Sequence, residues 1–173
     1  MTKPLMTKPL VTRTPTTQLW DIAGADGLEV TEQLFGKSVG YLSPFQSVET
    51  VLKNEACSVL RLCDHNFRIR YGAPLDQLVT PLNRCVWVKR YPWLTRLTIS
   101  TKQLLVLTEH LTVRAPHRLA HFPNHQALPA CLETIPLLIW RHLIEGKPVI
   151  ELQVAQIDLR RLKQRLDSFN FVV

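Results

Sequence analysis

The chain lacks most of the features that reveal a protein's chemistry by inspection. It contains no C-x-x-C pair, no G-x-S-x-G, no phosphate-binding loop and no dinucleotide fingerprint, so no motif predicts a catalytic class. Only 6 of its 173 residues are glycine, and the glycine- and aromatic-rich signature of common RNA-binding sheets is missing. The longest apolar run, around 135–140, is too short to cross a membrane. We therefore expect no membrane span.

Acidic residues are scarce relative to basic ones. There are 14 Asp and Glu against 21 Lys and Arg, which gives a formal net charge of +7. Such a balance favours anionic partners, although it also serves solubility alone. The 46% hydrophobic fraction is typical of a globular protein and excludes a disordered chain. We expect residues 1–17, rich in proline and threonine, to be a disordered basic tail, and residues 18–173 to form a single domain.

The four cysteines match no zinc-binding spacing, which predicts reduced and mostly buried thiols. Residues 1–17 also lack the apolar segment of a signal peptide. Together these observations predict a cytoplasmic protein.

Helical patterns are predicted towards both ends of the chain. Leu28–Phe35 is preceded by Asp26 as N-cap and followed by Gly36. Ser43, Pro44 and Gln46 resemble a capping box. The expected helices are Leu28–Phe35, Ser43–Asn54, a short one at Pro74–Leu82, Pro129–Ile144 with a kink or break at Pro136, and Asp158–Phe169 with a leucine stripe at Leu159, Leu162 and Leu166.

The middle of the chain changes to a period of two, which is typical of strands. Cys57–Cys63 and Phe67–Tyr71 flank a short polar turn and predict a hairpin. Further strands are expected at Cys85–Lys89, Leu94–Ser100, Leu104–Arg114 and Pro148–Val154. Short connections such as 90–93 predict antiparallel neighbours. The predicted fold is α+β, with a mainly antiparallel sheet of about five to six strands and helices at both chain ends.

A basic sheet face is the first candidate site. Arg68 and Arg70 alternate with Phe67, Ile69 and Tyr71, which indicates one apolar and one solvated face. The predicted binding residues are Arg61, Arg68, Arg70, Lys89 and Arg96, with Trp87, Tyr91 and Trp93 as stacking surfaces beside them. They favour a non-catalytic binding or adaptor protein, and its anionic partner is either an acidic protein surface or nucleic acid.

Histidines gather in one proline-rich loop. His117, His121 and His125 recur every four residues and Cys131 follows them, so a metal-dependent protein is a third hypothesis. Pro123 interrupts the helical spacing that three ligands on one face would need, and no recognised metal motif is present. We expect no cofactor and no tightly bound metal.

The segment Arg96-Leu-Thr-Ile-Ser-Thr-Lys-Gln-Leu-Leu-Val-Leu-Thr-Glu109 is similar to the terminal strands of chorismate lyases. The resemblance implies a second hypothesis, a small-molecule enzyme or ligand pocket, in which Glu109 is the carboxylate that lines the pocket. About sixty residues follow Glu109 here, whereas that family is nearly finished at this point. Under this alternative the protein is a lyase with a small-molecule ligand.

Overall fold

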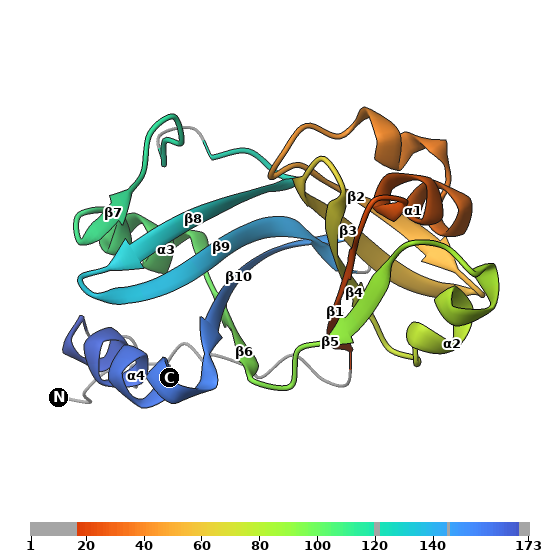
Figure 1. The fold of residues 1–173 in the computed structure, drawn as a ribbon. Coiled ribbons are helices and arrows are strands. Elements are labelled where there is room, and N and C mark those ends of the chain that lie inside the picture. The colour runs from red at the N-terminus through yellow and green to blue at the C-terminus, as the bar shows by residue number, and fades with distance from the viewer. Residues whose placement is uncertain (1–16, 120–121, 145, 170–173) are drawn as a thin grey trace, which may run out of the picture.

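The computed structural model describes residues 17–119, 122–144 and 146–169. Of the predicted disordered tail, only Thr17 falls within these residues. The described chain is α+β and contains two antiparallel five-stranded sheets, which lie side by side in Figure 1. The predicted fold class and the antiparallel pairing are therefore confirmed.

The first sheet, sheet A, has the strand order β2-β3-β4-β1-β5. Its strands are β1 (Gln18–Ala23), β2 (Ser47–Leu52), β3 (Glu55–Cys63), β4 (Asn66–Tyr71) and β5 (Trp87–Arg90). The predicted hairpin is confirmed as β3–β4, closed by a turn at Asp64 and His65. Among the described residues, strand β5 pairs with β1 alone, so it forms one edge of this sheet.

The second sheet, sheet B, has the strand order β6-β10-β9-β8-β7. Its strands are β6 (Leu94–Ile99), β7 (Leu111–Val113), β8 (Gln126–Leu132), β9 (Ile135–Ile144) and β10 (Lys147–Ala155). The expectation that the strands on either side of 90–93 pair with each other is wrong. The connection is short, yet it carries the chain from β5 in sheet A to β6 in sheet B, where β6 pairs with β10.

Helices cover the outer face of each sheet. The apolar core of sheet A includes residues of α1 (Gly27–Phe35), α2 (Asp76–Val79) and the short turn η1 (Lys37–Tyr41). The core of sheet B includes residues of α3 (Thr101–Thr108) and α4 (Leu159–Ser168). The remaining short turns are η2 (Thr80–Leu82) and η3 (Gln156–Asp158). Within the described residues, no helix has the length and apolar character needed to span a membrane.

The two sheets face each other through their more polar sides. In β10, Ile150, Leu152 and Val154 belong to the core of sheet B, whereas Glu151 and Gln153 point the opposite way. The inner faces also share a small apolar cluster of Leu19, Leu60, Ala127 and Trp140. An isolated bridge between Gln46 and Gln126 connects the sheets directly. The polar sides of sheets A and B therefore lie in the interior of the molecule, between the two sheets.

The helix expected at Ser43–Asn54 is wrong, because β2 occupies the middle of it, from Ser47 to Leu52. The Ser43 N–H does donate to Gln46 Oε1 (2.9 Å), as in a capping box, but this bond closes a turn. Phe45 then adopts a positive φ of 64°, which ends any helical course. The β-branched residues that follow pair with β3 and bury Leu52.

The helix expected at Pro129–Ile144 is also wrong, since this segment forms the β8–β9 hairpin. Pro136 would remove a hydrogen bond from a helix, whereas here it lies exposed at the start of β9, before the pairing with β10 begins at Leu137. Alternation in β9 buries Ile135, Leu137 and Ile139 on one face. The apolar run was compatible with both structures, and the sheet decided between them.

The strand expected at Leu104–Arg114 is helix α3 followed by the short β7. Ser100 and Gln103 form a complete capping box, in which each side chain accepts from the other residue's backbone N–H. Leu104 and Leu107, three residues apart, are both buried against sheet B. Local capping together with helical spacing therefore outweighs the β-like composition.

Candidate functional site

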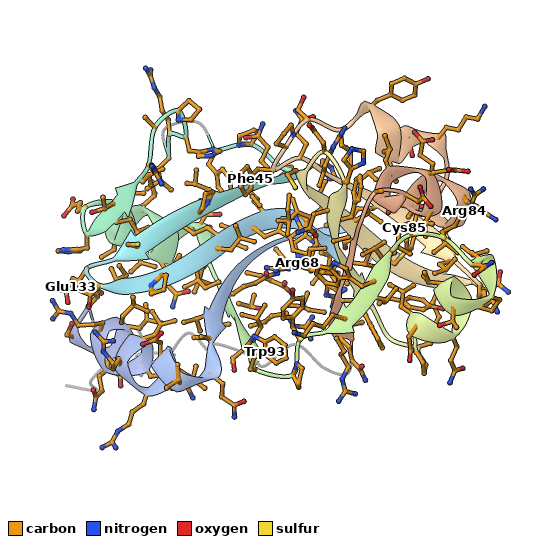
Figure 2. The ribbon with its side chains drawn as sticks, in the orientation of Figure 1. Phe45, Arg68, Arg84, Cys85, Trp93 and Glu133 are labelled. Carbon is orange, nitrogen blue, oxygen red and sulfur yellow. The ribbon has the colours of Figure 1, made fainter. Side chains whose placement is uncertain are left out.

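A layer of charged side chains lies between the two sheets. Arg68 of β4 donates from Nε and Nη2 to the two carboxylate oxygens of Asp21 on β1, at 2.9 and 3.1 Å. Its Nη1 donates to Gln153 Oε1 of sheet B at 3.0 Å. Figure 2 shows Arg68 near the middle of the molecule, between the sheets. One guanidinium thus links three strands.

Glu151 of β10 is the centre of a second group. Its side chain is fully buried, and Oε1 lies 3.5 Å from Arg70 Nε and 3.9 Å from Arg96 Nη1. Its Oε2 lies 3.6 Å from His142 Nε2. Burial raises the pKa of a carboxyl, but these cationic neighbours outweigh burial and hold the pKa of Glu151 below its usual range. Glu151 is therefore an ionised carboxylate.

His142 of β9 has carboxylates on both sides. Its Nδ1 lies 3.6 Å from Glu49 Oε1 and 3.2 Å from Ser58 Oγ, and the Ser58 hydroxyl donates to Glu49 Oε2 (2.6 Å). Burial lowers the pKa of His142, yet the Glu151 and Glu49 carboxylates raise it more, so this pKa lies above its ordinary value. Since both ring nitrogens face acceptors, the geometry fits an imidazolium.

Ser58, His142 and Glu151 therefore stand in the order of a serine, histidine and acid triad. A triad needs a neutral imidazole that can accept the serine proton and a substrate that reaches the hydroxyl. Here all three side chains are buried, and the Ser58 hydroxyl donates to Glu49 Oε2 instead of to the imidazole. The three residues therefore form a buried contact between the two sheets.

Most of the predicted basic face belongs to this interior. Arg70 is buried, Arg68 and Arg96 are nearly so, and the expected exposure of Arg68 and Arg70 is wrong. The alternation of polar and apolar residues in β4 does separate two faces, but the polar face contacts a second sheet instead of water. The Arg61 side chain is also mostly buried, and its guanidinium donates to the backbone carbonyls of Gly40, Leu42, Cys63 and Asp64. Lys89 is the member of the set that is exposed.

Lys89 belongs to an exposed group on and beside β5, which we call the β5 strip: Trp87, Lys89, Arg90 and Trp93. Trp87 and Trp93 expose 48% and 42% of their surface, which is unusual for tryptophan. The Lys89 ammonium lies 4.8 Å from the centre of the Trp93 ring, and Tyr91 packs edge-on against the same ring. Tyr91 in turn lies under the Arg68 guanidinium, so the strip is anchored to the interior.

Two surface pockets accompany these features. One, with a volume of about 250 Å³, lies at the end of β5. Its lining includes Arg90 of β5, the following Tyr91, and Arg96 of β6. The other, about 310 Å³, is lined among others by Phe45 and His117. The first of them borders the β5 strip.

The predicted metal ligands are dispersed within the described residues. His117 packs edge-on against Phe45, and His125 Nδ1 lies 3.9 Å from Glu49 Oε1. Cys131 is in β8, and His121 lies outside the described residues. Among the residues that the structure describes, no group of three His, Cys, Asp or Glu side chains could hold a metal ion.

Glu109, the residue of the lyase hypothesis, is the C-cap of α3 and is exposed. A lyase pocket would require this carboxylate in a cavity beside a cation. Neither of the two surface pockets includes Glu109 in its lining.

The sequence does not predict that Asp21, Glu49, His142 and Glu151 belong to the charged layer between the sheets. For Glu151 the sequence does hold a signal. A charged residue between Ile150 and Leu152 in a predicted strand indicates that this strand has one polar face, which needs polar partners or water. Two of its partners, Arg70 and Arg96, come from strands far from β10 in the chain, so no spacing in the sequence could reveal them, whereas His142 lies across the β9–β10 hairpin.

No family model and no curated protein matches this chain. Solved structures with the same fold include a glycine cleavage system aminomethyltransferase T from Bartonella henselae, with 16% identity and a TM-score of 0.67. The match covers 87% of this chain and 43% of that chain, so this chain spans less than half of the aminomethyltransferase's length. Another is a chain of a heterotetrameric sarcosine oxidase from Corynebacterium sp. U-96, with 18% identity, a TM-score of 0.59 and coverage of 87% and 77%. At such identities the likeness establishes a shared fold.

Proposed function

We propose that the protein is a non-catalytic binding subunit or adaptor that engages an acidic surface of a partner protein through the β5 strip. The observation that carries this proposal is the pairing of two exposed tryptophans with Lys89 and Arg90. Tryptophan and arginine are enriched at the centres of protein interfaces, and aromatic anchors supply most of their binding energy.

Two further observations support an acidic protein partner. The chain carries a net charge of +7, and cationic residues at an interface rim speed association with a partner of opposite charge. The sarcosine oxidase neighbour is a chain of a heterotetramer, and this chain covers most of its length. A role as one subunit of a larger assembly is consistent with that neighbour.

A protein surface is favoured over nucleic acid as the anionic partner. Lys89 already covers one face of the Trp93 ring, where a base would have to stack. Proteins that bind nucleic acid by charge commonly neutralise about six to ten phosphates, whereas the strip supplies two cations. We also propose a cytoplasmic location, because Cys63 and Cys85 are exposed free thiols, which suit a reducing compartment.

The test is isolation of the full chain from its own cells at low salt, with chemical crosslinking to locate bound proteins. We expect an acidic polypeptide crosslinked at the β5 strip, released by salt and lost from the double variant Lys89→Glu, Arg90→Glu. Lys102→Glu on α3, an exposed lysine outside the strip, is the matched control and should retain the partner. Retention by the double variant contradicts the proposal, and displacement of the protein by single-stranded oligonucleotide would indicate nucleic acid instead.

A further inference from the structure

The outer edge of β5 offers backbone hydrogen-bonding groups. On its inner side β5 pairs with β1, from Trp87 opposite Ala23 to Arg90 opposite Trp20. The Tyr91 N–H donates to the Leu19 carbonyl at 2.9 Å, and antiparallel residues face the same neighbour alternately. The N–H and C=O of Val88 and Arg90 therefore point outward, where no residue in the described part of the chain bonds to them.

The side chains of β5 give this edge two different faces. Val88 packs with the core of sheet A, whereas Trp87 and Lys89 project on the opposite side and are exposed. At the end of the strand, the pocket of about 250 Å³ has Arg90 and Arg96 in its lining. A strand laid along β5 would meet indole and ammonium groups on one side, and the Arg90 side of the pocket at its end.

Charge decides which kind of segment fits along the outer edge of β5. A second copy of this chain would place another Lys89 and Arg90 against the first pair, and like charges oppose such pairing. The first sixteen residues carry Lys3, Lys8 and Arg13 and no acidic residue, so they are mismatched as well. An acidic segment matches the edge in charge.

We propose that β5 accepts an extended acidic segment of a partner protein, which adds a sixth strand to the edge of sheet A. This inference rests on the proposed function and specifies its mode of binding. Backbone bonds to Val88 and Arg90 hold the segment in place, as in other cases of strand addition. Carboxylates of the segment meet Lys89 and, at the end of the strand, Arg90, which is exposed and lies in the lining of the pocket.

The test uses the full chain and a fluorescent octapeptide of alternating valine and glutamate. Binding is followed by anisotropy and by the emission of Trp87 and Trp93. One companion peptide replaces glutamate by lysine, and a second keeps the acidic sequence but carries methyl groups on all backbone nitrogens. Lys89→Glu and the control Lys102→Glu are compared with the parent, and far-ultraviolet circular dichroism establishes that each variant is folded.

We expect saturable binding of the acidic peptide, at least tenfold weaker binding of the methylated and lysine peptides, and at least tenfold weaker binding by Lys89→Glu. Lys102→Glu should bind within twofold of the parent. Equal binding of the methylated peptide, still weakened by Lys89→Glu, overturns strand addition and leaves the proposed function standing. Insensitivity to Lys89→Glu overturns both. Absence of binding at millimolar peptide, or self-association through β5 in sedimentation experiments, also overturns the inference.

Discussion

Glu151 is the residue around which the buried charges of this protein are arranged. Arg70, Arg96 and His142 all lie within 4 Å of its carboxylate; Glu151 and His142 are fully buried, and the two arginines expose only 7% and 13% of their side chains. Removing charges from water costs several kcal/mol per ion, and an opposite charge repays that cost only while both partners remain. The network is therefore sensitive to the loss of a single member.

Glu151→Gln should lower the free energy of unfolding by about 3–5 kcal/mol, because it leaves Arg70 and Arg96 without their carboxylate partner and removes one of the two carboxylates beside His142. Urea denaturation at neutral pH measures this change. Glu29→Gln is the control, since Glu29 pairs with Arg84 at the surface, where such pairs contribute about 0–1 kcal/mol. Equal losses in the two variants would contradict the network described here.

His142 should make stability depend on pH. Its pKa in the folded protein is raised, so the folded state holds the proton more tightly than the unfolded chain, whose histidine titrates near about 6.5. The stabilisation is complete below that value and is lost as the pH rises through the higher folded pKa. Urea unfolding at a series of pH values from about 6.5 upward should show the decline, and in His142→Asn the slope should flatten. An unchanged slope in that variant would assign the dependence elsewhere.

At the scale of the elements, α4 is where the sequence pattern and the packing agree best. Its leucines recur at helical spacing, and Leu162 and Leu166 are completely buried against sheet B. The rest of the helix carries basic residues, of which Arg161 pairs with Asp158 and Arg165 with Glu133. The predicted final helix is confirmed, and its apolar stripe serves as core.

Leu162→Ala should reduce the free energy of unfolding by about 2–5 kcal/mol, the usual cost of a buried leucine. The neighbouring Lys163 is exposed, and Lys163→Ala should change stability by less than about 0.5 kcal/mol. Thermal melts of both variants make the comparison. A melt of Leu162→Ala that matches the parent would mean that the stripe does not support the fold.

At the scale of the whole molecule, the two sheets are joined by both apolar and polar contacts. Trp140 is fully buried between them, stacks on His142 and donates from Nε1 to Ser47 Oγ of sheet A at 3.0 Å. Leu143 of sheet B donates its backbone N–H to Glu49 of sheet A. Because these buried contacts cross from one sheet to the other, we expect the sheets to unfold together.

Trp140→Ala should lower the free energy of unfolding by about 3–5 kcal/mol. It should also lower the protection of backbone amides against hydrogen exchange by a similar factor in both sheets. Hydrogen exchange read by mass spectrometry at β3 and β9 tests this expectation. Trp93→Ala, which removes an exposed indole, should leave both strands protected. Loss of protection confined to sheet B would show that the sheets are independent units.

The sequence by itself determined the elements whose signals are local. The Cys57–Tyr71 hairpin, the helix ended by Gly36 and the leucine stripe of the last helix follow from turn residues, caps and periodicity within about fifteen residues. Where a local signal fitted two structures, as at Ser43–Asn54 and Pro129–Ile144, strand pairing within the sheets decided between them: β2 pairs with β3, and β8 pairs with β9.

Only the tertiary structure decided what the polar faces do. Alternation at Arg68 and Arg70 indicates that a strand has two unlike sides, but a side that meets water and a side that meets another charged sheet have the same pattern. Asp21, Gln153 and Glu151, which neutralise or bind these arginines, come from strands far away in the chain. Ion pairing depends on distance in space and not on position in the chain. For that reason only the folded structure shows that Arg68 and Arg70 lie in the interior, whereas Lys89 and Arg90 of β5 lie at the surface.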